Sequence, residues 1–273
     1  MKKAIVITGA STGIGRETAK YFAEKGWKVA ATMRSPEKEA ELQKIENINI
    51  YQLDVTDQDS IASAKDSIIK DFGKVDVVLN NAGYALMGAL ETITQEQFRY
   101  QYDVNVFGLV EVTQAFIPHF RSNNFGMFIN ISSVGGKITF PYMSPYLSTK
   151  WAVEGFSESL YFELNRLGIQ VKTVEPGFVA TDFGGRSLVL VHSDTIKDYD
   201  EGLGKLKNTI ENTHAKNPSH PSVVAEVIWE AATDGKDQFR YVAGNDAVQT
   251  IANRNEVGDE AFIQNMKIHV FEH

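Results

Sequence analysis

The stretch "KAIVITGASTGIG", residues 3–15, decides the fold class of this chain. Residues 3–8 form a short apolar run typical of a buried strand, and Gly9, Gly13 and Gly15 follow at once. Glycine permits a tight turn and lets the backbone approach a phosphate, and a helix beginning there offers free N–H groups. The stretch therefore predicts a strand, a phosphate-binding turn and a helix over 14–25. A merely tight turn between strand and helix is the alternative.

The rest of the chain repeats this alternation of strand and helix. Continuous apolar strands joined by helices predict a parallel sheet covered on both faces, so the expected fold is α/β, doubly wound and Rossmann-type. Without an internal repeat or low-complexity linker, residues 1–273 are expected to form a single domain. The other expected strands are 28–33, 48–53, 75–80, 126–131, 169–175 and 239–244, and the other expected helices are 36–45, 57–72, 94–120, 145–167 and 221–233.

Two segments lie outside the alternation. Residues 183–220 are rich in Gly, Ser, Asp, Asn, Lys and His, with a helical piece near 198–212. A polar insertion late in an α/β domain is often a binding loop, so we expect a lid over a substrate site, with a surface excursion of no role as the alternative. Residues 246–273 are expected to form a C-terminal extension of two short helices.

Composition excludes several classes of function. A hydrophobic content of 43% and a charged content of 23% are ordinary for a soluble globular protein, and the net charge of −8 argues against a nucleic-acid partner. The absence of cysteine excludes disulfides, thiol nucleophiles and zinc–thiolate sites, and the scattered histidines imply no metal. No apolar run reaches the roughly 18 residues of a membrane span, so a cytoplasmic protein without a membrane partner is expected.

The stretch "SPYLSTK", residues 144–150, contains a candidate proton-transfer pair. Tyr146 and Lys150 are four residues apart and would share one face of a helix. The spacing alone is not specific, because Tyr21 and Lys25 have it too. Position separates the two pairs: Tyr146 opens the helix after the fifth strand, at the carboxyl edge of the sheet, where ligands bind in such folds.

Six motifs occur in order between residues 5 and 182: "TGASTGIG" (8–15), "NNAG" (80–83), "DVNVFG" (103–108), "NISS" (130–133), "YLSTK" (146–150) and "PGFVATD" (176–182). Together they resemble the classical short-chain dehydrogenase/reductase family, whereas the later chain is similar only in outline. The resemblance implies hydride transfer between a nicotinamide cofactor and a carbonyl or secondary alcohol. It also implies that the catalytic residues are Asn105, Ser133, Tyr146 and Lys150.

The expected chemistry follows from what hydride transfer requires. A hydride that reaches a carbonyl carbon leaves negative charge on the oxygen, so hydrogen-bond donors from Ser133 and Tyr146 would stabilise it and Tyr146 would supply the proton. In the reverse direction Tyr146 is the base, and a nearby Lys150 ammonium would lower its pKa. By resemblance, Lys150 also bonds the nicotinamide ribose, and Asn105 holds a water that relays protons toward Lys150.

The end of the second strand bears on the choice of cofactor. It reads "AATMRSPEK", with Arg34 where an acid would bond a ribose 2′-hydroxyl. A guanidinium suits a 2′-phosphate, so NADP(H) is expected in preference to NAD(H), although a solvated surface charge is the alternative for Arg34. Residues expected to bind the cofactor are Gly9, Ser11, Thr12, Gly13, Ile14, Gly15, Arg34, Asp54, Val55, Asn81, Ala82, Gly83, Tyr146, Lys150, Pro176, Gly177, Val179 and Thr181.

Several of these roles come from the resemblance alone. It implies that Asp54 and Val55 contact the adenine end, that Asn81 and Gly83 line the ribose, and that Thr181 approaches the nicotinamide. Ordinary turn or capping roles are the alternatives for Asp54 and Asn81.

The substrate pocket is expected from 85–87, 135–142, Phe178 and 183–220. Its aromatic residues, Phe140, Tyr142 and Phe183, favour an apolar carbonyl or alcohol substrate, although aromatic residues are equally typical of plain core. The helix over 145–167 is apolar on more than one face, which favours a homodimer or homotetramer.

Two other functions fit parts of the sequence. A non-catalytic NADP-binding regulator would not need Ser133, Tyr146 and Lys150 together. A sugar-nucleotide epimerase on the same fold usually carries a different glycine spacing and a larger substrate domain.

Overall fold

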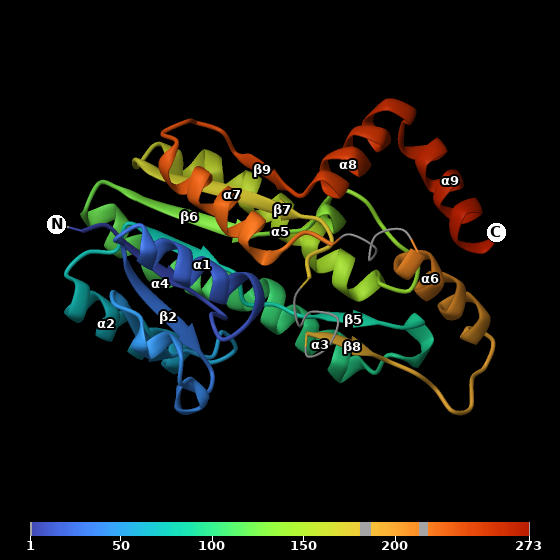
Figure 1. Cartoon of the computed structure of the whole chain (residues 1–273), viewed down its shortest axis with the longest axis horizontal. Helices are drawn as coiled ribbons and strands as arrows, with labels where there is room; N and C mark the ends of the chain where they lie inside the picture. Colours follow the sequence, from blue (N-terminus) through green and yellow to red (C-terminus); the bar gives the residue numbers. More distant parts are fainter. Residues whose placement is uncertain (1, 181–186, 213–217, 273) are drawn as a thin grey trace.

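Seven parallel strands form the central sheet of the computed structural model, which describes residues 2–180, 187–212 and 218–272 (Figure 1). The strand order is β3-β2-β1-β4-β6-β7-β9, so the doubly wound sheet expected from the sequence is confirmed. The order reverses between β1 and β4, and this is the point where such sheets bind ligands. The strands are β1 Ala4–Ile7, β2 Lys28–Met33, β3 Ile48–Gln52, β4 Val77–Asn80, β6 Gly126–Ile131, β7 Ile169–Pro176 and β9 Arg240–Ala243.

Helices cover both faces of the sheet because successive strand residues point to opposite sides. In β1, Ile5 and Ile7 pack into the core beneath α1 (Gly13–Glu24) and α7 (Pro221–Thr233). Ala4 and Val6 pack into the core on the other face. That second core is covered by α2 (Gln58–Phe72), α4 (Gly108–Ser122) and α5 (Ser144–Asn165), as Figure 1 shows.

The prediction of a helix over 36–45 is wrong. The structure has two single-turn 3₁₀ helices instead, Pro36–Lys38 and Leu42–Lys44. Glu39 lies between them, and its carboxylate accepts hydrogen bonds from the N–H groups two and three residues ahead. A side chain that bonds its own backbone in this way competes with helical hydrogen bonding, which explains the break.

The helix expected over 94–120 is interrupted by a wider turn. α3 (Gln95–Tyr102) begins at a capping box, in which Thr94 and Gln97 bond each other's backbone N–H. A π-helical turn, Asp103–Phe107, then precedes α4. Such turns inside helices are frequently found at functional sites, and this one contains Asn105.

The remaining elements lie beyond the carboxyl edge of the sheet. A short parallel pair joins β5 (Ala85–Met87) to β8 (Leu188–Leu190). α6 (Asp200–Asn212) follows, and it packs against α9 (Asp259–Phe271) at the end of the chain, after α8 (Asn245–Val257). Helices therefore lie where the sequence predicted them in the 198–212 and 246–273 segments (Figure 1).

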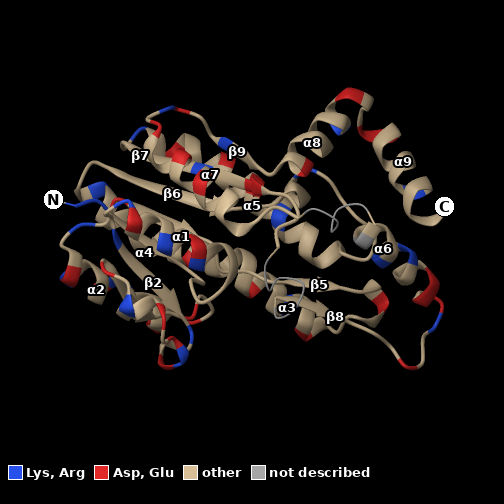
Figure 2. Ribbon diagram, in the orientation of Figure 1, with Lys and Arg blue, Asp and Glu red and all other residues tan. Residues whose placement is uncertain are grey.

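The ribbon carries charges of both signs side by side. Figure 2 shows Lys and Arg interspersed with Asp and Glu along α1, α2 and α6. Within the described ranges, no helix combines the length and the apolar character that crossing a bilayer requires.

Candidate active site

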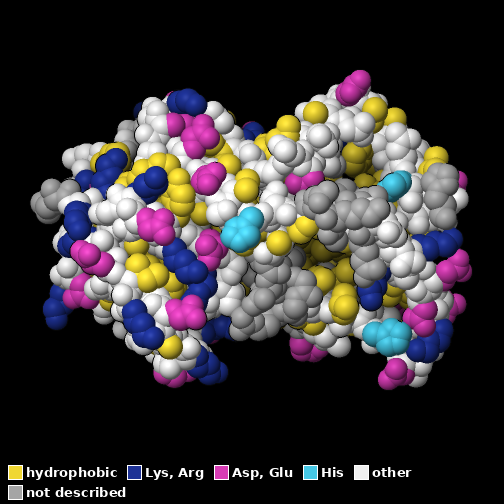
Figure 3. Space-filling model, in the orientation of Figure 1, with side chains coloured by type: hydrophobic (Ala, Val, Ile, Leu, Met, Phe, Trp, Pro, Cys, Tyr) yellow, Lys and Arg dark blue, Asp and Glu magenta, His cyan; other side chains and the backbone are white. Residues whose placement is uncertain are grey.

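A cavity of about 790 Å³ lies along the carboxyl edge of the sheet. It runs from Arg34 and Asp54, after β2 and β3, past the glycine turn to Ser133 and Tyr146, and on to Leu188 and β8. Figure 3 shows hydrophobic side chains gathered where the surface is hollowed between the sheet and helices α6, α8 and α9. One cavity thus connects the predicted phosphate-binding turn with the predicted chemical group.

The glycine turn is shaped by steric requirements that the sequence implied. Gly9 and Gly13 have φ angles of +65° and +56°, which favour glycine, and a Cβ on Gly9 would lie 2.9 Å from the Cα of Ala82. Gly15 does not line the cavity; a Cβ there would lie 2.5 Å from the carbonyl oxygen of Gly9. The main chain of the turn therefore forms a close cradle at the start of α1, which fits a pyrophosphate.

The "NNAG" loop is held against this turn. Thr8 Oγ1 accepts hydrogen bonds from the N–H groups of Asn81, at 2.9 Å, and Ala82, at 3.0 Å. The Asn81 side chain donates back to the carbonyl oxygens of Thr8 and Gly9. Asn81, Ala82 and Gly83 all line the cavity, so the expected ribose-side residues are brought together with the turn.

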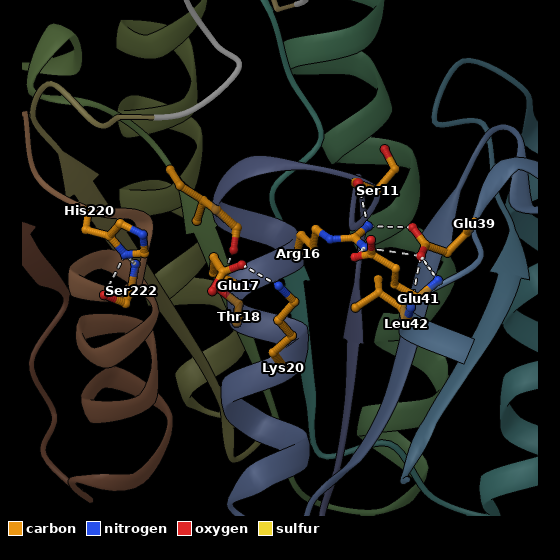
Figure 4. Close-up of polar contacts among 11 residues, drawn as sticks. Ser11, Arg16, Glu17, Thr18, Lys20, Glu39, Glu41, Leu42, His220 and Ser222 are labelled. Atoms are coloured by element: carbon orange, nitrogen blue, oxygen red, sulfur yellow. Dashed lines mark hydrogen bonds and ion pairs between the residues drawn. The ribbon is translucent and has the colours of Figure 1, made fainter. Parts of the chain in front are cut away.

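Two arginines lie near the end of the cavity where the adenosine is expected, and they differ in their partners. Figure 4 shows the Arg16 guanidinium bonded to the Ser11 carbonyl oxygen and to the carboxylates of Glu39 and Glu41. Arg34 lines the cavity and donates instead to a neutral group, the Tyr100 hydroxyl, at 3.3 Å. The Arg34 guanidinium is thus the one left to face an anionic ligand, whereas Arg16 braces the turn.

The other residues expected at this end also line the cavity, namely Ser11, Thr12, Ile14, Asp54 and Val55. The carboxylate of Asp54 accepts hydrogen bonds from the backbone and the hydroxyl of Thr56, so it also has the turn role that was the alternative.

Ser133, Tyr146 and Lys150 meet at the middle of the cavity. Ser133 caps the 3₁₀ turn Val134–Gly136, and its side chain hydrogen-bonds Tyr146. Tyr146 and Lys150 lie on the first two turns of α5, with the Lys150 Nζ 5.7 Å from the centre of the Tyr146 ring. Lys150 Nζ also donates to the carbonyl oxygen of Ile131, at 2.8 Å, which fixes its position at the end of β6.

The second Tyr–Lys pair has similar local geometry in a different place. Lys25 Nζ lies 5.1 Å from the centre of the Tyr21 ring, at the end of α1. Neither residue lines the cavity. Position in the fold, and not spacing, therefore separates the two pairs.

Burial sets the protonation of the buried pair. It raises the pKa of Tyr146 to about 12, opposed by the hydrogen bond with Ser133. It lowers the pKa of Lys150 to about 8, opposed by the negative charge of Glu154. The lowered pKa expected for Tyr146 is therefore not what its protein surroundings produce, because desolvation of the phenolate outweighs the other effects.

Asn105 lies behind this group and does not line the cavity. Its side-chain nitrogen donates to the Tyr84 carbonyl oxygen, at 2.9 Å, and to Thr149 Oγ1, at 3.1 Å. Its side-chain oxygen accepts the Tyr84 N–H, at 3.0 Å. Asn105 thus joins the loop before β5 to the helix that carries Tyr146 and Lys150.

The end of β7 forms the wall opposite the turn. Pro176, Gly177 and Val179 line the cavity, whereas Thr181 and Phe183 lie outside the described residues. Asp246 on α8 accepts the Phe178 N–H, at 2.7 Å, and a Cβ on Gly177 would lie only 2.2 Å from its carboxylate. No pattern in the sequence indicated that Asp246 would bond the backbone at this side of the cavity.

The far part of the cavity is apolar. Its lining there includes Met87, Phe140, Met143, Leu188 and Ile210. The sequence analysis did not place Met143 in the substrate pocket. Its apolar side chain, directly before the helix that carries Tyr146, could have indicated that position.

Tyr142 was expected in the substrate pocket, but it does not line the cavity. It has a φ of +59° and packs against Gly202 of α6 and Phe271 of α9. The residue therefore links the loop before α5 to the last helices.

Known proteins resemble this chain over most of its length. An uncharacterized oxidoreductase of Schizosaccharomyces pombe is 42% identical over 236 residues, which cover 85% of this chain and 96% of that protein. A 3-ketodihydrosphingosine reductase of Bacteroides thetaiotaomicron is 35% identical over 240 residues, covering 88% and 87%. The crystal structure of a short-chain dehydrogenase from Streptomyces avermitilis matches with a TM-score of 0.86 at 31% identity, covering 98% of this chain and 97% of that one.

A doubly wound sheet with a glycine cradle and a Ser–Tyr–Lys group on one cavity defines an oxidoreductase that uses a nicotinamide cofactor. The family model described as short chain dehydrogenase matches residues 3–188. The chain belongs to this family of enzymes, as the six motifs indicated. Among solved structures of similar fold, some hold NADP and others NAD.

Proposed function

We propose that the chain is an NADP(H)-dependent oxidoreductase that reduces an apolar ketone, or oxidises the corresponding secondary alcohol. The observation that carries the proposal is the meeting of Ser133, Tyr146 and Lys150 on the same cavity as the glycine turn and Arg34. A non-catalytic regulator would not need this combination, and a sugar-nucleotide epimerase usually carries a different glycine spacing and a larger substrate domain. When bound, the nicotinamide cofactor supplies or accepts the hydride.

The chain's own residues supply the proton and the charge stabilisation. Ser133 and Tyr146 would donate hydrogen bonds to the substrate oxygen, and Tyr146 would transfer its proton to it as negative charge develops. The raised pKa keeps the proton on Tyr146 at neutral pH, so the phenol is in the form that reduction requires. In oxidation Tyr146 must instead act as a base, which needs the positive charge of Lys150 nearby.

Asn105 and Lys150 would hold this arrangement in place. Both hydrogens of the Asn105 amide and its oxygen are engaged by Tyr84 and Thr149, so a relay water would be held by the main-chain carbonyl of Asn105. Lys150 has further donor hydrogens beyond its bond to Ile131, and these would reach the nicotinamide ribose.

Cofactor binding is assigned to the glycine turn, the "NNAG" loop and the end of β7. The preference for NADP(H) rests on Arg34, whose guanidinium can make paired hydrogen bonds to a 2′-phosphate. Thr181 lies outside the described residues, and its expected approach to the nicotinamide is part of this proposal.

The substrate would lie against the apolar part of the cavity, between Tyr146 and α6. Met87, Met143, Leu188 and Ile210 offer hydrophobic contact and few polar partners, which suits an alkyl chain or a fused ring system next to the reacting carbonyl. The similarity to a 3-ketodihydrosphingosine reductase supports an apolar ketone. The described part of 183–220, with β8 and α6, would act as the lid within a single domain.

A homo-oligomer is part of the proposal. The side chains of α4 and α5 that face away from the sheet border a groove of about 230 Å³, lined by Val110, Ile117 and Phe156 among others. Phe162, also on α5, is 64% exposed, which is unusual for so large an apolar side chain. A second copy of the chain would cover this face.

Replacement of Tyr146 by Phe tests the central assignment. NADPH oxidation should be measured across a panel of steroids, quinones, aldehydes and keto esters, and turnover of accepted substrates should fall by about 10²-fold or more in Tyr146→Phe. NADPH should still bind, as followed by its fluorescence. The control is Tyr21→Phe in the other pair, which should retain full activity. Survival of turnover in Tyr146→Phe would sink the assignment.

A further inference from the structure

Helix α6 approaches the loop before α5 closely at one glycine. Gly202, Leu206 and Ile210 recur every four residues along α6 and therefore share one face of the helix. Leu206 is buried in the apolar cluster beneath the helix, and Ile210 lines the cavity. A Cβ on Gly202 would overlap the hydroxyl of Tyr142 and lie 2.9 Å from the Cζ of the same ring. Glycine at this position therefore lets α6 pack closer to the loop than a residue with a side chain would.

The Tyr142 side chain is fixed where Gly202 meets it. Its φ of +59° is rare for a bulky residue, and such a conformation persists only where the surroundings hold it. The Tyr142 carbonyl oxygen accepts the N–H of Gly88, at 2.8 Å, which ties the loop to the residue after β5. The ring packs edge-on against Tyr199, just before α6, and against Phe271, at the end of α9, with ring centres 6.4 Å and 6.2 Å away. Tyr142 is therefore a stop that sets how near α6 lies to the loop.

The position of α6 sets the width of the apolar part of the cavity. Ile210 lies about two turns beyond Gly202 on the same face, so a displacement at Gly202 is carried along the helix to the cavity lining. Ile210 packs on the same apolar cluster as Met143 and Leu188, and all three line the cavity. A helix held close to the loop therefore narrows the space beside Tyr146.

We propose that Tyr142 and Gly202 are positioning residues that determine which ketones fit, and that their contact selects an unbranched alkyl ketone over a ketone in a fused ring system. The cavity of about 790 Å³ must hold a dinucleotide as well as the substrate, so the share left for the substrate is small. A slender chain fills a narrow apolar space without moving α6, whereas a fused ring system needs the helix to move away from Tyr142. This deepens the proposed function and rests on it, since it takes an apolar ketone beside Tyr146 as the substrate.

Gly202→Ala tests the contact, because the added methyl group has to push α6 away from Tyr142 and so widens the apolar part of the cavity. The probes are a straight-chain alkyl keto ester and a steroid ketone. The measurement is the Kd of each probe for the complex of the enzyme with oxidised cofactor, by isothermal titration calorimetry. Wild type should bind the straight-chain ketone more tightly, and in Gly202→Ala the ratio of steroid Kd to straight-chain Kd should fall by about 10-fold. The Kd for NADPH should stay that of wild type, since neither residue lines the cavity.

Gly204→Ala is the matched control, because it makes the same change on the same helix where a Cβ would meet no atom within 4 Å. Its ratio of the two ketone Kd values should stay that of wild type. Tyr142→Asn removes the ring with a residue that tolerates a positive φ, so it should lower the ratio by itself. Adding Gly202→Ala to Tyr142→Asn should then change the ratio by less than about 2-fold, because the two residues act through one contact.

Three results would overturn the proposal: an unchanged ratio in Gly202→Ala, an equal fall in Gly204→Ala, or a wild type that binds the steroid ketone more tightly. Tyr142→Asn decides the question if Gly202→Ala fails to fold. Binding needs no turnover, so a wild type that binds the straight-chain ketone without reducing it would contradict the proposed function and not this inference.

Discussion

Arg16 and Arg34 illustrate how much a single residue depends on its partners. Both lie near the start of the cavity, and the sequence gives no reason to treat Arg16 as different from any helical surface charge. In the structure Arg16 is bonded to two carboxylates and to the glycine turn, while Arg34 faces the cavity. Selectivity for the cofactor phosphate is therefore expected to depend on Arg34.

Arg34→Asp should reverse the cofactor preference. The change removes a charge-assisted donor and places a carboxylate where it can bond a ribose hydroxyl, so the ratio of kcat/KM for NADPH over NADH should fall by about 10- to 100-fold. The measurement is steady-state kinetics with both cofactors on one substrate. Lys38→Asp, in the same loop, is the control and should leave the ratio unchanged. An unaltered ratio in Arg34→Asp would contradict the assignment.

The carboxyl group of Glu39 makes the free energy of unfolding depend on pH in the acidic range. Burial alone would raise its pKa, but the bond from Arg16 and two backbone N–H groups lower it to about 2, from 4.5 in the unfolded chain. Its contribution is therefore present above about pH 4.5 and is lost as the pH falls toward 2. Glu39→Gln should cost about 1–3 kcal/mol of unfolding free energy at pH 7, with a smaller difference near pH 3.

Urea unfolding at the two pH values measures this difference. Glu41→Gln removes an exposed carboxylate from the same Arg16 and should cost less than about 1 kcal/mol. Equal losses in the two variants, or a Glu39→Gln loss that does not shrink in acid, would contradict the expectation.

At the scale of elements, α9 supports the part of the cavity where the substrate is proposed to bind. Val270 packs with Met87 of β5 and Leu206 of α6, and Met266 and Phe271 pack around them. A chain ending after Gly258 should therefore show a several-fold higher KM for an apolar substrate, because part of the apolar support beneath α6 is lost.

NADPH binding provides the comparison for this truncation. Among the described residues α9 packs mainly on α6 and α8, so the Kd for NADPH, from fluorescence titration, should stay near that of the full chain. A comparable loss of cofactor affinity would mean that α9 supports the whole cavity.

Most of the elements, and most of the chemical site, could be predicted from the sequence. Most of the seven strands are short, largely apolar runs, and the site motifs are short local patterns, so both are readable without knowing the fold. The break near Glu39 could not be predicted, because a glutamate side chain does not have to bond its own backbone as this one does. The π turn at Asn105 could not be predicted either, and the Asn105 side chain there bonds the backbone of Tyr84, which is distant in sequence. The role of Asp246 could not be predicted from the sequence either, because its partner Phe178 is distant in sequence.

At the scale of the whole molecule, the exposed face of α4 and α5 is expected to be an interface between copies. Phe162→Glu places a charge on this face and should convert the oligomer to a smaller species, measured by light scattering over a range of concentrations. Val248→Glu, on α8, changes another exposed apolar residue elsewhere and should leave the mass unchanged. A wild type that is already monomeric would contradict the expectation.

The contact between Gly177 and Asp246 limits how this chain can be recombined with its relatives. The aspartate occupies the space that any side chain at residue 177 would need, and it holds the backbone of Phe178. A chimera that exchanges the last two helices must therefore carry an acid of the same length opposite a glycine. Crossover points placed between β7 and α8 will produce folded hybrids only when both parents share that pair, whatever substrates they accept.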